Sequence, residues 1–133
     1  MKTILGRRSL GLLVVALFAS GCGADGPQLG KVNGRVILDG QPLPNAFITF
    51  TPEKPGRPSM AKSDTAGQYE LRFNPSKMGA LVGQHQVRVS TADVTFNDKK
   101  IPELVPAKYN LKGSIPITVG PKANHIDLDL KSL

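Results

Sequence analysis

Apolar and polar residues alternate along most of the chain from residue 31 onward. Successive side chains of a β-strand point to opposite faces of a sheet, so this period of two predicts strands with one buried face. The predicted strands, with their inward-facing residues, are 31–38 (Val32, Gly34, Val36, Leu38), 46–50 (Ala46, Ile48, Phe50), 60–63, 69–73 (Tyr69, Leu71, Phe73), 83–90 (Val87, Val89), 115–119 (Ile115, Ile117, Val119) and 126–130 (Ile126, Leu128, Leu130).

Turn-forming residues separate these strands. Asp39-Gly40 supplies a position of positive φ, and the two prolines that follow prevent the first strand from continuing. Asp64 to Gly67 predicts a second tight turn, with Asp64 suited to an Asx turn. Residues 52–58 and 92–113 are rich in Pro and charged residues and are predicted as loops. Because a loop as long as 92–113 is unusual in a compact domain, we expect it to be functional or docked on the body.

The predicted elements define the fold class. A chain of 133 residues has room for one domain. It contains 14 Gly, 11 Pro and no Trp, which favours short strands around an aliphatic core. Seven short strands without a helical period predict an all-β, seven-stranded β-sandwich over residues 31–133.

The first 21 residues have a different pattern. Lys2, Arg7 and Arg8 precede an apolar run over 10–19, which is typical of a secretory signal peptide and too short for a transmembrane helix. Paired arginines are also found in twin-arginine leaders, so the export route stays open between the two systems. Without the three basic residues of this leader, 14 basic and 10 acidic residues remain, a net charge of +4. They are scattered and no aromatic series interleaves with them, so nucleic-acid binding is not expected.

The leader ends in Ala19-Ser20-Gly21-Cys22. Small residues before a cysteine resemble the bacterial lipobox, in which the thiol is acylated and the chain is cut before it. Ala19 stands where Leu is commoner. Cys22 is the only cysteine, so no intramolecular disulfide competes for it. We therefore expect a signal peptide over 1–21, lipidation of Cys22 with acyl chains such as palmitate, and a Gly-rich tether over 22–30. Gly23, where Asp favours inner-membrane retention in lipoproteins, favours the outer membrane.

Several short motifs of the domain resemble carboxypeptidase regulatory-like domains. The first is Val32-x-Gly34-x-Val36 followed by Asp39-Gly40-Gln41-Pro42-Leu43-Pro44-Asn45-Ala46-x-Ile48. Asp64-x-x-Gly67-x-Tyr69, then Gly83-x-His85-x-Val87-x-Val89, then Pro106-x-Lys108-Tyr109 and the Asn124–Leu130 ending continue it in order over 31–131. The resemblance implies a transthyretin-like (prealbumin-like) sandwich. In carboxypeptidases this domain is an accessory to a separate catalytic domain, so it implies no reaction.

Candidate catalytic and metal-binding residues are few. His85 has the inward parity of Val87 and is predicted to be a structural histidine. His125 shares an outward face with Asp127 and Asp129, which makes a metal site conceivable, but adjacent carboxylates on a strand are usually only solvated charges. We therefore expect no metal, no cofactor and no catalytic residue. No Gly-x-Ser-x-Gly elbow, phosphate loop or zinc-ligand spacing occurs in the sequence.

Two functions remain open at this point. The first is a lipid-anchored, non-catalytic binding or structural module of the cell envelope, facing the periplasm or the cell surface. Its loops 52–62 and 92–113 would then contact an envelope protein or glycan. The alternative is a hydrolase of the transthyretin-like superfamily, such as hydroxyisourate hydrolase. That enzyme ends in Tyr-Arg-Gly-Ser, whereas this chain ends in Asp129-Leu130-Lys131-Ser132-Leu133.

Overall fold

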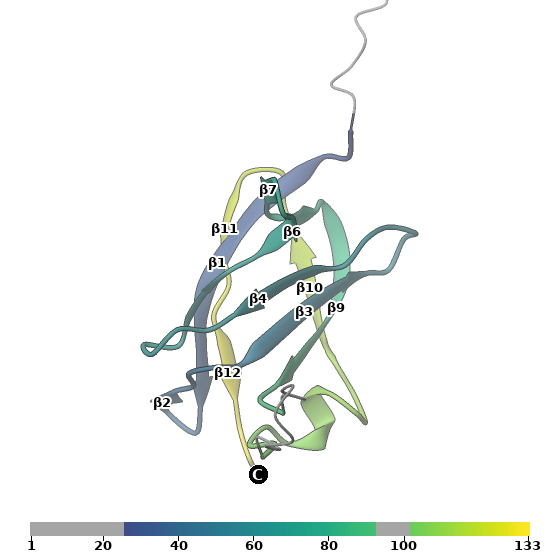
Figure 1. The fold of residues 1–133 in the computed structure, drawn as a ribbon. Coiled ribbons are helices and arrows are strands. Elements are labelled where there is room, and N and C mark those ends of the chain that lie inside the picture. The colour runs from purple at the N-terminus through teal and green to yellow at the C-terminus, as the bar shows by residue number, and fades with distance from the viewer. Residues whose placement is uncertain (1–25, 93–101) are drawn as a thin grey trace, which may run out of the picture.

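Two β-sheets form the body of the molecule in the computed structural model, which describes residues 26–92 and 102–133 (Figure 1). The predicted all-β sandwich is confirmed. The predicted signal peptide, Cys22 and part of the predicted loop 92–113 lie outside the described residues.

The first sheet is built around the longest strand, β1 (Leu29–Leu38). One edge of β1 pairs in parallel with β11 (Ala123–His125) and then with β12 (Leu128–Leu130), which lie one after the other along it. Its antiparallel partners are β8 (Ala80–Leu81), β5 (Gln68–Glu70) and β2 (Gln41–Pro42). The first strand of the domain is therefore paired with its last two strands.

The second sheet is antiparallel throughout. Its order is β10 (Ile115–Val119), β9 (Gly83–Ser90), β3 (Phe47–Pro52), β4 (Ser59–Lys62), β6 (Arg72–Asn74) and β7 (Lys77–Met78). The pairs between β3 and β9 run from Phe47 opposite Ser90 to Pro52 opposite His85. These two long strands form the centre of the sheet.

Each of the seven predicted strands is present, but the described chain has twelve strand segments. One predicted strand is divided in two, another is shortened and preceded by an additional strand, and β2, β7 and β8 are two-residue additions beside turns. The strand at 69–73 breaks at Leu71, whose N–H bonds Val32 in the first sheet, and the chain then crosses to pair with β4 in the second. The strand at 126–130 is preceded by β11 and begins only at Leu128. β1 starts at Leu29, two residues before the predicted start, because Leu29 and Gly30 pair with β8.

The core lies between the two sheets and follows the predicted parity. Alternate residues of β1, including Val32 and Val36, are fully buried, and their neighbours Lys31 and Asn33 are exposed. The largest fully buried side chain is Phe50 of β3. Several positions predicted to face inward are only half-buried, namely Leu38, Phe73, Ile115, Ile117 and Ile126. Among the described residues, the buried hydrophobic core extends from Val32 to Leu130.

Two predicted turns adopt the backbone geometry that their residues favour. Asp39 and Gly40 have φ values of 49° and 82° and join β1 to β2 in a two-residue hairpin. The Asp64 carboxylate accepts hydrogen bonds of 2.9 Å from the N–H groups of Ala66 and Gln68. Gly67 has a φ of 76°, and a Cβ there would lie 2.6 Å from the Val36 carbonyl oxygen, so a side chain is excluded.

The described part of the loop 92–113 is docked on the body. Glu103 accepts hydrogen bonds from the N–H groups of Thr91 (2.8 Å) and Val105 (3.0 Å), and the Ser90 hydroxyl donates to its other carboxylate oxygen. The Val105 side chain is buried in the core. A short 3-10 helix (Ala107–Tyr109) follows beside the C-terminus, where the Tyr109 hydroxyl accepts from the Lys131 N–H.

Candidate functional site

A polar groove with a volume of about 870 Å³ lies on the outer face of the first sheet. Outward-facing positions of β1 and β5 form its floor, and β4 and β6 contribute to one wall. The groove is lined by Asn33, Gly34, Arg35, Ile37, Lys62, Asp64, Gln68, Tyr69, Glu70, Arg72, Met78, His125 and Asp127. Most of these residues are charged or carry a hydrogen-bonding side chain.

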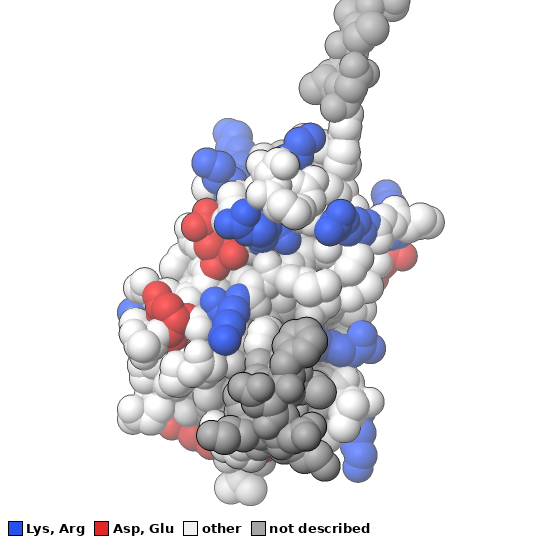
Figure 2. All heavy atoms as spheres, viewed as in Figure 1, with Lys and Arg blue, Asp and Glu red and all other residues white. Residues whose placement is uncertain are grey.

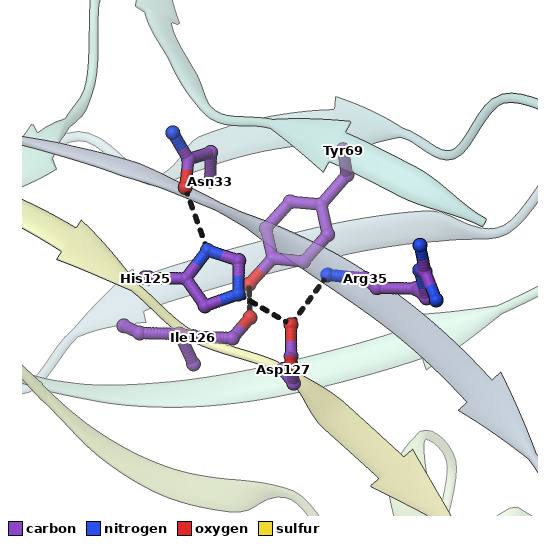
Figure 3. Close-up of polar contacts among 6 residues, drawn as sticks. All are labelled: Asn33, Arg35, Tyr69, His125, Ile126 and Asp127. Atoms are coloured by element: carbon purple, nitrogen blue, oxygen red, sulfur yellow. Dashed lines mark hydrogen bonds and ion pairs between the residues drawn. The ribbon is translucent and has the colours of Figure 1, made fainter. Parts of the chain in front are cut away.

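A short polar network crosses the groove (Figure 3). His125 ends β11, and Asp127 lies two residues further, so both side chains reach the outward face. The His125 Nε2 atom lies 3.1 Å from the Asp127 carboxylate, and its Nδ1 atom lies 3.1 Å from the Asn33 side-chain oxygen. The same Asp127 oxygen accepts a hydrogen bond of 2.9 Å from the Arg35 N–H. The imidazole is thus held between β1 and the 125–127 segment while it remains accessible.

Tyr69 lies beneath this network and joins it to the core. Its hydroxyl donates to the Ile126 carbonyl oxygen at 2.5 Å. Burial raises the pKa of Tyr69 above its usual range, and the nearby Asp127 charge raises it further. The phenol is therefore protonated at neutral pH and acts as a hydrogen-bond donor in the wall of the groove.

Both signs of charge line the groove. Arg35, Lys62 and Arg72 contribute positive charges, and Asp64, Glu70 and Asp127 contribute negative charges. A site of this kind can hold a polar ligand through hydrogen bonds and opposed charges. The groove lies on an exposed sheet face, where the His125 and Asp127 side chains are 71% and 49% exposed.

The metal ligands considered from the sequence do not come together as a set. His125 contacts Asp127, but Asp129 pairs with Lys131 at 3.3 Å instead. Over residues 26–92 and 102–133, no group of three or more His, Cys, Asp or Glu side chains is arranged to hold a metal ion.

His85 lies far from this exposed arrangement. It is completely buried on the inward face of β9, as its parity predicts. Its Nε2 atom donates to the Leu81 carbonyl oxygen at 2.6 Å, and its ring centroid lies 5.7 Å from that of Phe50. These contacts are those of a structural histidine in the core.

In the described parts of the two loops predicted to bind a partner, few residues reach the groove. In the segment 52–62, only Lys62 lines it. The described residues 102–113 lie beside the end of β9 and the C-terminus. The sequence analysis missed the groove because its residues are the outward half of the strand alternation, which by itself indicates only a solvated surface. One signal was available in the sequence: outward residues of segments that are distant in sequence, such as Asn33, Glu70 and Asp127, are polar or charged.

Comparisons with known proteins identify no relative by sequence. No protein-family model matches the chain, and no curated protein is significantly similar to it. Among solved structures, a DUF3823 family protein from Parabacteroides merdae is similar over 79% of this chain, with 13% identity and a TM-score of 0.47. The chain spans 47% of that protein. A 9R-lipoxygenase from Cyanothece is similar over 80% of this chain and 16% of its own, with 16% identity and a TM-score of 0.38.

In the parts of the chain that the structure describes, no helix has the length and apolar character needed to cross a bilayer.

Proposed function

We propose that this protein is a lipid-anchored protein of the bacterial cell envelope whose β-sandwich acts as a non-catalytic binding or structural module. The anchor is supported by the leader, which ends in small residues before Cys22, the single cysteine of the chain. Because one acyl chain gives only marginal membrane affinity, the two or three chains that lipobox processing attaches are needed for stable anchoring. The domain then faces the periplasm or the cell surface, with the outer membrane favoured.

The proposed family is that of carboxypeptidase regulatory-like domains with a transthyretin-like sandwich. The residues that carry this resemblance have structural roles in the described chain, which supports the proposal. Gly34 leaves room for the Ile126 carbonyl, Gly67 adopts positive φ, and the Tyr69 hydroxyl bonds the Ile126 carbonyl. These three motif residues thus help to maintain the sandwich, and Gly34 and Tyr69 also line the groove.

The groove is the proposed binding surface, and the observation that carries this choice is its lining. Polar side chains from β1, β4, β5, β6 and the 125–127 segment line one hollow, and they include both cations and anions. We expect the ligand to be a polar segment of an envelope protein or glycan that offers both hydrogen-bond donors and acceptors. Apolar small molecules do not fit this lining.

Lipidation is tested by comparing the wild-type chain with Cys22→Ser in cells. The wild type should enter the detergent phase on phase partitioning and should incorporate labelled palmitate. Cys22→Ser should do neither. Partitioning of the wild type to the aqueous phase would rule out the anchor.

Binding through the groove is tested by photo-crosslinking in intact cells. A photoreactive residue replaces Gln68 in the groove, and a matched one replaces Thr118, which is exposed on β10 outside it. The position in the groove should give a defined adduct that disappears when Asp127→Ala is added, whereas position 118 should give none. An adduct that is unchanged by Asp127→Ala, or equal at both positions, would exclude the groove as the binding surface. A third probe at Leu111, which is 92% exposed, tests the predicted loop in the same way.

A further inference from the structure

One end of the sandwich is strongly basic, and it is the end at which the chain enters the domain. Figure 2 shows Lys and Arg side chains gathered around the point where the N-terminal segment leaves the body. We define this basic end by six exposed residues: Lys31, Lys54, Arg57, Arg72, Lys77 and Lys122.

Four of the lysines surround the first described residues. The Lys77 ammonium lies 3.5 Å from the position that a Cβ on Gly26 would occupy. Lys54 lines a hollow of about 250 Å³ together with Gln28. The side-chain amide of Asn124 donates to the main-chain carbonyl oxygens of Lys31 and Lys122, at 3.0 and 2.9 Å, so these two residues are neighbours in the fold. These cations are therefore arranged around the root of the tether.

The two arginines extend the basic end along the second sheet. Arg57 and Arg72 line one hollow of about 310 Å³ with Pro75. Arg72 also donates to the Pro75 carbonyl at 3.0 Å, next to the hairpin in which Asn74 pairs with Lys77. This hairpin fixes Arg72 and Lys77 at the same end of the domain.

Among the described residues, none of the six cations of the basic end forms an ion pair, although Glu70 lines the same groove as Arg72. The two ion pairs among residues 26–92 and 102–133 join His125 to Asp127 and Lys131 to Asp129, and neither involves the six cations. The nearby Glu53 accepts from the Gln86 side chain. Asp25 contributes one negative charge in the adjoining sequence, which leaves a clear positive excess.

The proposed anchor places this end close to the bilayer. Only the segment 23–28 separates Cys22 from the first strand residue, Leu29. A Gly-rich tether of this length has an end-to-end distance of about 15 Å, and at most about 25 Å when fully extended. Electrostatic attraction to a charged surface decays over about 8 Å at physiological ionic strength. These tether lengths are upper limits on the separation, so the tether allows the cations at its root to approach the bilayer to within the range of the surface potential.

We propose that the basic end docks on anionic phospholipid headgroups and orients the domain on the membrane. The proposal rests on the anchor at Cys22, which supplies the proximity, and the cations then supply a second, electrostatic attachment. Docked in this way, the domain points residues 102–113 and the C-terminus away from the bilayer, because they lie at the opposite end of the sandwich (Figure 1).

The test uses the mature chain, residues 22–133, with Cys22→Ser, so that binding does not depend on lipidation. This chain contains all the core residues that the structure describes, from Val32 to Leu130. Binding is measured by sedimentation with vesicles of phosphatidylcholine containing phosphatidylglycerol, and with pure phosphatidylcholine. One triple variant, Lys54→Gln, Lys77→Gln and Lys122→Gln, removes three charges of the basic end. The matched control, Lys108→Gln, Lys112→Gln and Lys131→Gln, removes three exposed lysine charges outside the basic end and the groove.

We expect binding to the anionic vesicles alone, and weaker binding as salt is raised. The apparent affinity should fall on the order of fivefold per lysine removed from the basic end, and less than about twofold in all for the control triple. An equal loss of affinity in both triple variants would show that only net charge matters and would overturn the docking surface. The absence of binding to anionic vesicles at low salt would also overturn it. Binding that is equally strong on neutral vesicles would also overturn it. Failure of palmitate labelling in cells, with vesicle binding intact, would remove the anchor and leave the lipid-binding surface standing.

Discussion

The hydroxyl of Tyr69 donates a hydrogen bond of 2.5 Å to the main-chain carbonyl of Ile126, a residue 57 positions further along the chain. This carbonyl lies over Gly34, where a Cβ would come within 1.9 Å of its oxygen. The main-chain N–H of Ile126 donates to the main-chain carbonyl oxygen of Asn33 at 2.8 Å. The interval between β11 and β12 is thereby fixed against β1, and His125 and Asp127 are directed into the groove on either side of it.

Replacing Tyr69 with Phe should leave the Ile126 carbonyl without its partner in a mostly buried position. We expect the free energy of unfolding to fall by about 1–3 kcal/mol, measured by urea denaturation of the mature chain. Tyr109→Phe is the matched control, because the Tyr109 hydroxyl accepts a hydrogen bond from Lys131 at an exposed site. Its loss should cost less than about 1 kcal/mol. Equal destabilisation by the two substitutions would contradict the role of Tyr69.

Two buried serines should respond in opposite ways to replacement by alanine. The Ser63 hydroxyl donates to the Leu43 carbonyl at 2.6 Å and accepts from the Ala46 N–H at 2.8 Å, so Ser63→Ala leaves two buried backbone groups unpaired. The Ser59 hydroxyl is buried without a hydrogen-bond partner among the described residues. We expect Ser63→Ala to cost about 2–3 kcal/mol and Ser59→Ala to be neutral or slightly stabilising.

Thermal and urea unfolding of the two alanine variants, compared with the wild type, measures both effects. Ser59 begins β4 and Ser63 directly follows it, and both are buried, so the loss of hydroxyl volume is similar in each. A destabilisation by Ser59→Ala as large as that by Ser63→Ala would show that packing, and not hydrogen bonding, determines the result.

Glu103 should make the docking of residues 102–113 dependent on pH. Burial raises the pKa of Glu103, but hydrogen bonds from Ser90, Thr91 and Val105 outweigh it and hold the pKa below the ordinary value of 4.5. A carboxyl whose pKa is lowered by folding stabilises the fold where it is ionised. This contribution is therefore present above about pH 4.5 and is lost as the pH falls through the lowered pKa.

Glu103→Gln should remove that contribution. We expect a loss of about 1 kcal/mol or less at neutral pH, because the side chain is mostly exposed and solvent screens its charge. Urea denaturation of wild type and variant across a pH series should show the two curves converging below about pH 4.5. Glu53→Gln serves as the control, since that carboxylate accepts its hydrogen bond from a single side chain, Gln86. A constant difference between wild type and Glu103→Gln at every pH would argue against the ionised carboxylate as the cause.

The strand alternation predicted most of the fold because burial on one face imposes a period of two on the sequence. It located the inward faces of β1, β3 and β9 and the burial of His85. The alternation did not show where the chain passes from one sheet to the other, because the period of two continues through the crossing. Leu71 lies at this crossing and stays buried while the backbone on either side of it changes partner from β1 to β4.

The groove could not be predicted for a different reason. Alternation places Asn33, Glu70 and Asp127 on outward faces, but it does not say which strands are neighbours. Their meeting depends on two pairings of β1, with β5 on one side and with the 123–130 segment on the other. Parallel pairing of the first and last strands joins residues more than ninety positions apart, and no local pattern encodes it.

Removal of the His125 side chain should separate the structural role of the groove network from a binding role. The His125 and Asp127 side chains are 71% and 49% exposed, so the pair should contribute little to stability, and His125→Ala should change the free energy of unfolding by less than about 0.5 kcal/mol. Two ligands of this kind do not complete a zinc site, which needs three or four. Added Zn²⁺ should therefore shift the melting temperature of wild type and His125→Ala equally. A rise in melting temperature seen only in the wild type would establish a metal site in the groove. Equal shifts in melting temperature, together with loss of the crosslink from position 68 in His125→Ala, would make His125 a ligand contact of the binding surface.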